Sequence, residues 1–366
     1  MTKKERLQAV RERRAPDCMP VWPRVKSQMV YGHGLMLPDV IGQDWYDTDK
    51  ITEAVLANIK NIGYDLAIPA YIDPGFGVPP LGGSFLIPNK FGLAVSNTDD
   101  QPVKTKADWP KVQRMLAKFD VRKSDPRMKG ALEVIKNVSQ EVGDEVALVP
   151  SFHCGISTAM FLLRPDEALL EDMTEDPDWV DEMCKVGTDF ATEWLCAQYE
   201  AGANSAAMVA EGIGTVMVSP KMNERFNLEN ISRLVEELKK RFNQGTWIHL
   251  HGDISTPGNY RYLTRLIEEA GVEGIHFDEA NSTEWVKEQV VDKLGIPVSV
   301  IVDGSVIANG PEEKIREAVK NELSKIGDGI GFMMAPSCQV LPFTPNEYFK
   351  TWVDATHEYG RYPINQ

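Results

Sequence analysis

The chain has 366 residues, 43% of them hydrophobic and 25% charged, with a formal net charge of −15 at pH 7, which is typical of a globular protein. The acidic balance argues against nucleic acid or an anionic membrane as the main partner, because both need a basic surface. No apolar run approaches the ~20 residues that cross a bilayer, no signal peptide is visible, and five scattered cysteines predict no disulfide framework, so we expect a cytoplasmic protein.

The first third of the chain combines helical segments with a long irregular one. Residues 1–15 are basic and predict an N-terminal helical extension, followed by a strand at 19–25. Apolar residues at helical spacing predict a helix at 47–62 and then a strand at 64–69. Residues 73–104 are rich in Gly and Pro, and loops this long are usually functional or disordered. Their aromatic and apolar side chains favour an ordered lid or hairpin.

Strands and helices alternate regularly from about residue 127. Helices are expected at 129–141, 166–173, 177–199, 226–242, 257–269, 283–293 and 311–326, and strands at 146–151, 205–210, 246–251, 274–279, 297–303 and 329–334. Alternation of this kind indicates parallel pairing. About eight strands in a chain of this length favour a single α/β domain over residues 1–366, a closed (β/α)₈ TIM barrel with its active site at the C-terminal mouth of the strands.

Two histidines one residue apart, His249 and His251, are the main candidates for chemistry. Side chains at i and i+2 on a strand share a face, so both imidazoles should converge at the end of the 246–251 strand. Cys338 follows the last predicted strand and would reach the same mouth. Two imidazoles and one thiolate with a fourth position open describe a catalytic zinc site. Taken singly, a histidine at a strand end is more often a hydrogen-bonded structural residue, and a lone cysteine is more often a small buried hydrophobe.

Further polar groups follow other strands. Asp278 could supply an oxygen ligand to the metal or orient an imidazole, although a loop hydrogen bond explains it equally well. Glu211 and Asp73 are candidates for acid/base chemistry or substrate contact, again with structural hydrogen bonds as the alternative. His153 and Cys154 are adjacent, so on a strand they would face opposite ways and are poor partners for one metal.

Several motifs resemble the uroporphyrinogen decarboxylase superfamily over roughly residues 16–362. They are Ser-Pro-Lys-Met-Asn-Glu-Arg-Phe at 219–226, His-Leu-His-Gly-Asp at 249–253, Gly-Val-Glu-Gly-Ile-His-Phe-Asp-Glu at 271–279 and the segment 329–338. The resemblance implies a (β/α)₈ barrel with its site at the C-terminal mouth. True decarboxylases hold substrate carboxylates with an Arg-Gln-Ala-Gly-Arg segment and need no metal. The corresponding stretch here has only Arg24 and Lys26 as cations, which argues against porphyrinogen decarboxylation.

The chain is more similar to the methylcobamide:coenzyme M and related corrinoid-dependent methyltransferases. That branch binds zinc through a His-x-Cys pair and a distant Cys. His249 matches the first ligand, Cys338 matches the last, and Asp278 matches a position that can carry a carboxylate near the metal. His251 departs from the pattern because it stands where the branch has Cys. Histidine still binds zinc, but one lost thiolate makes the metal a stronger Lewis acid and leaves the use of coenzyme M open.

The sequence therefore predicts a zinc-dependent methyltransferase. The resemblance implies a methyl-corrinoid, carried by a corrinoid protein, and a small thiol or tetrahydrofolate-like acceptor. Zn²⁺ would be held by His249, His251 and Cys338 with Asp278, and the 73–104 segment would help to dock the corrinoid protein. Two alternatives remain: a metal-independent decarboxylase or other lyase on the same barrel, and a non-enzymatic tetrapyrrole or corrinoid carrier. The carrier would not need three converging metal ligands.

Overall fold

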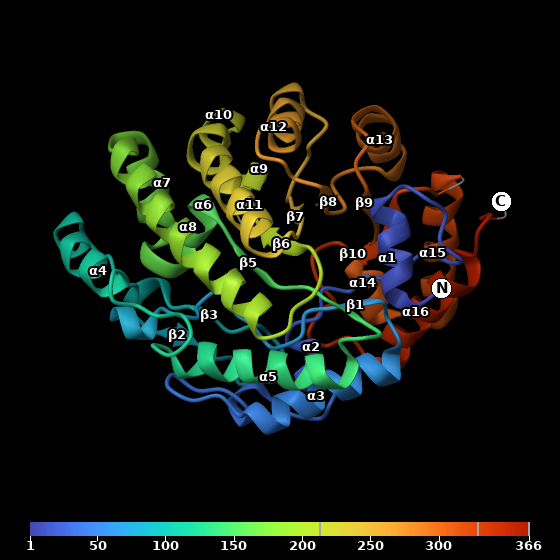
Figure 1. The fold of residues 1–366 in the computed structure, drawn as a ribbon, viewed down its shortest axis with the longest axis horizontal. Helices are drawn as coiled ribbons and strands as arrows, with labels where there is room; N and C mark the ends of the chain where they lie inside the picture. The colour runs from blue at the N-terminus through green and yellow to red at the C-terminus, as the bar shows by residue number, and fades with distance from the viewer. Residues whose placement is uncertain (212–213, 328, 365–366) are drawn as a thin grey trace.

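The fold is a ring of parallel strands surrounded by helices (Figure 1). The computed structural model describes residues 1–211, 214–327 and 329–364. Six strands pair in parallel in the order β10-β9-β8-β7-β6-β5. These strands are β5 (Ser151–His153), β6 (Ala207–Ala210), β7 (Thr246–His249), β8 (Gly274–His276), β9 (Val298–Val302) and β10 (Phe332–Pro336).

Further backbone hydrogen bonds join the two edges of this sheet. The parallel strands β1 (Leu66–Ala67) and β4 (Ala147–Leu148) lie beside it, and β4 leads directly into β5. The chain before β1 completes the ring, because Trp22 N donates to the Met334 carbonyl at 2.8 Å and Asp65 N donates to the Val21 carbonyl at 3.1 Å. The hydrogen bonds thus pass through eight segments and return to β10, which is the connectivity predicted for the barrel.

The long helices cover the outside of the ring (Figure 1). They are α3 (Thr48–Ile62), α5 (Pro126–Val142), α7 (Asp166–Glu175), α8 (Pro177–Glu200), α11 (Glu229–Phe242), α12 (Pro257–Glu268), α15 (Glu312–Ile326) and α16 (Asn346–Tyr359). The shorter ones are α2 (Gln28–Tyr31), α4 (Trp109–Leu116), α6 (Gly155–Thr158), α9 (Gly214–Met217), α10 (Pro220–Asn223), α13 (Thr283–Val286) and α14 (Gly304–Asn309). Local signals set the ends of α3, where Asp47 caps the first turn by accepting from Lys50 N at 3.0 Å and Gly63 ends the helix in the left-handed conformation.

The long segment 73–104 is ordered around a short hairpin, as expected. Strands β2 (Phe85–Leu86) and β3 (Val95–Ser96) pair in antiparallel fashion. Ser84 N donates to the Asp100 carbonyl at 2.9 Å, which ties the two arms together behind the hairpin. This segment follows β1, so it lies on the side of the ring where the strands end.

Helix α1 (Lys3–Arg11) closes the opposite end of the ring. It begins with the capping box of Thr2 and Glu5 and turns Leu7 and Val10 inward. These two side chains share a buried cluster with residues from the first halves of the strands: Trp22, Leu66, Ala147, Val149, Ala206, Met208, Trp247 and Met333. With the N-terminal end filled by apolar side chains, the opposite end of the interior remains for polar groups.

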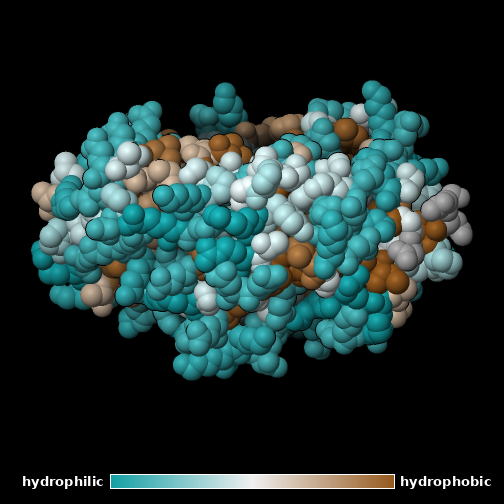
Figure 2. Space-filling model, turned by 90° about the horizontal axis from the view of Figure 1, so that it is seen from above, coloured by the Kyte–Doolittle hydropathy of each residue, from teal (hydrophilic) through white to brown (hydrophobic). Residues whose placement is uncertain are grey.

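The surface is predominantly hydrophilic in the view of Figure 2, with hydrophobic side chains in scattered patches. Helices α1 and α16 lie on the same side of the molecule (Figure 1), and Met19 N donates to the Gly360 carbonyl at 2.8 Å. Within the described ranges, none of the helices combines the length and apolar character that a membrane span requires. The five cysteines are all free thiols.

Candidate metal centre

The predicted ligands His249, His251 and Cys338 come together at the C-terminal mouth of the ring. Their ligand atoms all lie within 4.8 Å of one another, and we call these three residues the ligand cluster. His249 is the last residue of β7, and His251 and Cys338 each follow the end of a strand by two residues. His249 is buried, whereas His251 and Cys338 are half-buried towards the mouth. The strand predicted at 246–251 thus ends at His249, but His251 continues in the same direction and its ring lies beside that of His249.

The two imidazoles of the cluster turn the same nitrogen towards each other. His249 Nε2 lies 2.8 Å from His251 Nε2, while each Nδ1 faces another partner. His251 Nδ1 lies 3.4 Å from the Asp278 carboxylate, and His249 Nδ1 lies 2.7 Å from Nδ1 of His276. Imidazoles that bind a metal through one nitrogen are usually held through the other. The donor set and its orientation fit a zinc ion with one open position.

Asp278 lies beside the cluster and is engaged with the backbone. Its carboxylate accepts from Gly252 N at 2.7 Å and from Ala280 N at 3.1 Å, in addition to facing His251. Gly252 has φ of +89°, and a Cβ there would meet Thr215 Oγ1 at 2.7 Å, so this turn requires glycine. Of the two roles predicted for Asp278, the contacts favour orientation of His251 over direct ligation.

Opposite charges gather around the Cys338 thiol. Burial opposes its ionisation, but the positive charges of Arg24 and His251 outweigh burial and lower the pKa of Cys338 to about 7. The pKa of His251 shifts in the opposite direction. Burial disfavours its charged form, but hydrogen bonds and negative charge from Asp278 and Cys338 raise the pKa of His251 to about 9. A thiol that ionises near neutral pH is prepared to bind a metal, because the thiolate is the ligand form.

The sequence reasoning missed His276 as part of this centre. His276 pairs with His249 in the register of β7 and β8 and is fully buried. Its ring meets the edge of Trp22, with centroids 5.8 Å apart and planes at 79°. A signal for it was present, because His276 stands two residues before Asp278 within the strand predicted at 274–279, where the two side chains would share a face.

Asp73 lines a narrow cavity in the mouth together with Lys26 and His153. Its carboxylate accepts from the Tyr71 hydroxyl at 2.9 Å and from Gly75 N at 2.8 Å. Burial raises the pKa of Asp73 to about 6, against the hydrogen bonds from these two donors. Loss of solvation also lowers the pKa of Lys26. This cavity places the Asp73 carboxyl group, the Lys26 amine and the His153 imidazole inside the same mouth as the ligand cluster.

Glu211 lies on the other face of β6. The register pairs Ala210 with His249, so the next residue, Glu211, points away from the interior and towards the surrounding helices. There its carboxylate accepts a short hydrogen bond from the Tyr262 hydroxyl of α12. Burial raises the pKa of Glu211 to about 7. Cys154 lies in the outer layer as well, with its sulfur 3.6 Å from Thr188 Oγ1, so neither side chain joins the ligand cluster.

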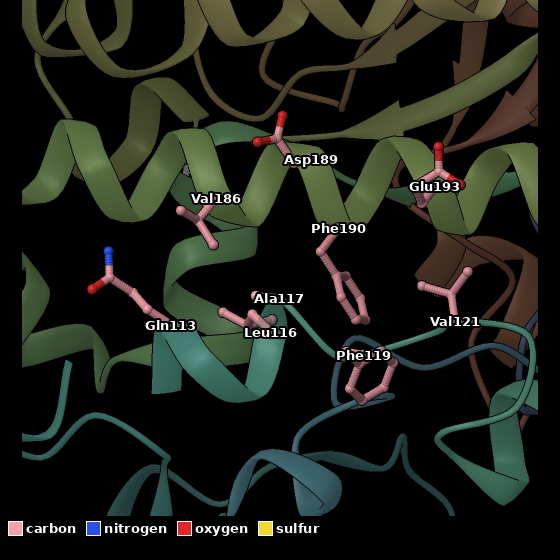
Figure 3. A pocket seen from close by; sticks show the side chains of 9 residues that line it. All are labelled: Gln113, Leu116, Ala117, Phe119, Val121, Val186, Asp189, Phe190 and Glu193. Carbon is pink, nitrogen blue, oxygen red and sulfur yellow. The ribbon is translucent and has the colours of Figure 1, made fainter. Parts of the chain in front are cut away.

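A second hollow lies on the outside of the barrel between α4 and α8 (Figure 3). Phe119 and Phe190 form its floor, with ring centroids 5.3 Å apart. The acidic side chains on its rim already have cationic partners, since Asp189 pairs with Arg233 and Glu193 pairs with an arginine at 2.6 Å. The described residues that line this hollow include no histidine and no cysteine. The candidate site is therefore the mouth of the barrel, where such side chains come together.

Comparisons with known proteins identify relatives of this chain. The chain is 22% identical over 359 residues to the methylcobamide:CoM methyltransferase MtaA of Methanosarcina barkeri, with 98% of each chain covered. It is also 22% identical to a uroporphyrinogen decarboxylase of Mannheimia succiniciproducens, with 74% of this chain and 73% of the relative covered.

Solved structures show the same fold. A methyltransferase from Methanosarcina mazei superposes with a TM-score of 0.79 at 20% identity, covering 98% of this chain and 99% of that one. A B12-independent methionine synthase from a Shewanella species gives 0.52 at 11% identity, covering 84% and 85%. The family model for uroporphyrinogen decarboxylase matches residues 2–359. The resemblance predicted from the motifs is confirmed: the chain belongs to the uroporphyrinogen decarboxylase family.

Proposed function

We propose that this protein is a zinc-dependent methyltransferase that moves a methyl group between a corrinoid and a small acceptor. The observation that carries the proposal is the convergence of His249, His251 and Cys338 on one point in the mouth of the barrel. Two further features support a resident metal: each imidazole is held through its Nδ1, and the Cys338 thiol ionises near neutral pH. The name of the MtaA relative supports the corrinoid as the second reactant.

The residues of the mouth would have different roles in binding the metal. His249, His251 and Cys338 would hold Zn²⁺, Asp278 would orient His251, and Arg24 would stabilise the thiolate form of Cys338. Zinc bound there would keep the sulfur of a thiol acceptor deprotonated at neutral pH. In the forward direction the acceptor thiolate attacks the methyl carbon. The new S–C bond forms as the C–Co bond breaks, and its electron pair remains on cobalt, which passes from Co(III) to Co(I).

The acceptor itself is proposed only as a class, a thiol or a tetrahydrofolate-like amine. With one thiolate among the three ligands, the metal draws more electron density from a bound sulfur than a two-thiolate site does. Asp73, which lines the cavity beside Lys26, is well placed to contact the acceptor. Glu211 would support β6 through Tyr262, because its side chain lies outside the ring.

The corrinoid would arrive on a carrier protein that docks over the mouth. Several exposed apolar side chains lie in segments that follow strands, where the mouth opens. They are Leu86, Phe91 and Val95 after β1, Val216 and Met217 on α9, and Phe343 after β10, each 41–67% exposed. Apolar groups in such a position favour a protein partner. We also propose a cytoplasmic location, with which five free cysteines are compatible.

The test is methyl transfer with purified components. Zinc-loaded protein is mixed with methylcobalamin and a panel of thiols and folates, and Co(I) formation is followed by absorbance. We expect acceptor-dependent demethylation that is abolished by a chelator and restored by zinc. The absence of demethylation with every acceptor would contradict the proposal. Chelator-insensitive release of CO₂ from carboxylated tetrapyrroles would favour the lyase instead.

A further inference from the structure

His276 extends the ligand cluster into the interior of the barrel. The three imidazoles form a line, because His249 Nε2 lies 2.8 Å from His251 Nε2 and His249 Nδ1 lies 2.7 Å from His276 Nδ1. His249 is 1% exposed and His276 is 0% exposed. Two imidazole nitrogens this close must share a proton, because two lone pairs at hydrogen-bond distance would repel each other.

The position of that proton follows from metal binding. A neutral imidazole has one N–H and one lone pair, so His249 can bind zinc through Nε2 only when its proton is on Nδ1. The Nδ1–H then needs an acceptor, and His276 Nδ1 at 2.7 Å is nearer than the His276 carbonyl at 3.3 Å. His276 can accept only as a neutral ring with its own proton on Nε2.

The other nitrogen of His276 supports the same assignment. The Pro336 carbonyl faces the His276 ring as a hydrogen-bond acceptor, although the contact lacks the geometry of a full hydrogen bond to Nε2. A carbonyl on this side of the ring favours a proton on Nε2 and leaves the Nδ1 lone pair for His249. An apolar ring at this position would lose less free energy of solvation on burial than an imidazole does. The neighbouring Trp22 already packs edge-on against the His276 ring. The polar character of residue 276 is therefore explained by what its Nδ1 does for His249.

We propose that His276 is a positioning residue that fixes the tautomer and the orientation of His249 by accepting its Nδ1 proton. The inference rests on the zinc site of the proposed function and deepens it. The two histidine ligands would then be held by unlike partners, a neutral imidazole behind His249 and the Asp278 carboxylate behind His251. A carboxylate makes the ligand behind it more basic than a neutral acceptor does, so His251 would be the stronger donor.

The experiment compares zinc affinity in three substitutions by competition with a chromophoric chelator. His276→Phe keeps the ring but removes the acceptor, and we expect the affinity to fall about 10- to 100-fold. His276→Asn places an amide oxygen near the position of Nδ1, and we expect it to stay within about fivefold of wild type. His33→Phe is the control, because this half-buried histidine lies 3.6 Å from the Glu53 carboxylate and belongs neither to the ligand cluster nor to the cavity of Asp73; we expect a change below about threefold.

A second readout does not depend on any variant. Nitrogen-15 spectra of the histidine rings are tractable because the chain has only six histidines. In the zinc-bound wild type we expect a protonated Nδ1 on His249 and an unprotonated Nδ1 on His276. The opposite assignment for His276 would overturn the inference, as would full zinc affinity in folded His276→Phe. Wild-type protein that binds no zinc at all would instead refute the proposed metal centre itself.

Discussion

The Arg24 guanidinium lies against Cys338: its Nη1 donates to the Cys338 carbonyl at 2.6 Å and stands 3.8 Å from the sulfur. Arg24 is only 2% exposed and has φ of +48°, a conformation that non-glycine residues rarely adopt. Such a conformation persists only where the surroundings impose it, and it often marks a functional site. Here it brings a buried positive charge from the first strand segment to the thiol that follows the last strand.

Removal of this charge should slow the reaction of Cys338 with iodoacetamide in metal-free protein. With a pKa of about 7, roughly half of the thiol is ionised at pH 7, and Arg24→Gln should raise the pKa and reduce that fraction. We expect alkylation of Cys338 at pH 7 to slow about three- to tenfold, as measured by peptide mass spectrometry. Arg316→Gln, which breaks a surface pair with Glu358, serves as the control. An unshifted pH–rate curve in Arg24→Gln would contradict this role.

Loss of the charge on Asp278 should weaken zinc binding. Asp278→Asn keeps one oxygen, enough for Gly252 N or Ala280 N but not for both, and removes the negative charge that faces His251 Nδ1. We expect zinc affinity to fall about 10- to 100-fold in a chelator competition. Asp253→Asn is the matched control, since this nearby exposed carboxylate accepts, among the described residues, from Ser255 alone. Equal affinities in the two variants would show that Asp278 does not support the site.

Glu211→Gln should change how stability depends on pH. Burial raises the pKa of Glu211 from 4.5 to about 7, so between these values the folded chain holds a proton that the unfolded chain releases. The free energy of unfolding therefore falls as pH rises through this window, by up to ~1.4 kcal/mol per pH unit. Glutamine cannot ionise and still accepts from Tyr262. In urea unfolding, we compare the free energy of unfolding of the variant with that of wild type at two pH values. We expect this difference to be more favourable to the variant at pH 8 than at pH 5, by on the order of 2 kcal/mol. The same difference at both pH values would count against a buried neutral Glu211.

Leu7→Ala tests whether α1 is part of the barrel core. Leu7 is 7% exposed and packs in the cluster that fills the N-terminal end of the ring. Truncation of a buried leucine leaves a cavity, and we expect a loss of about 2–4 kcal/mol in urea unfolding. Zinc affinity should stay within about twofold of wild type, because the ligand cluster lies at the other end of the strands. A loss below about 0.5 kcal/mol would mean that α1 is a loosely attached extension.

Much of this arrangement was predictable from local patterns. The alternation of strands with helices predicted the ring, and the i, i+2 spacing of His249 and His251 predicted a shared face. The position of Cys338 after the last predicted strand placed it at the same mouth, and the family resemblance pointed to the same residue. These predictions succeeded because parallel strands bring their ends to one mouth wherever they stand in the sequence.

Other features depended on register and packing, which the sequence does not display. Glu211 follows its strand as the other candidates do, but the pairing of Ala210 with His249 turns it outward. Arg24 reaches Cys338 only because of its unusual φ, which no pattern of residue types signals. His276 was open to prediction by its spacing from Asp278, yet its contact with His249 depends on the register of β7 and β8.

Metal analysis of purified protein tests the central claim most directly. Protein prepared without added zinc is measured by inductively coupled plasma mass spectrometry, with wild type beside Cys338→Ala and His251→Ala. The account predicts about one equivalent of zinc in wild type and a loss of most of it in both variants, whose circular dichroism should match that of wild type. Less than about half an equivalent in this wild-type protein, or full occupancy in the folded variants, would contradict it.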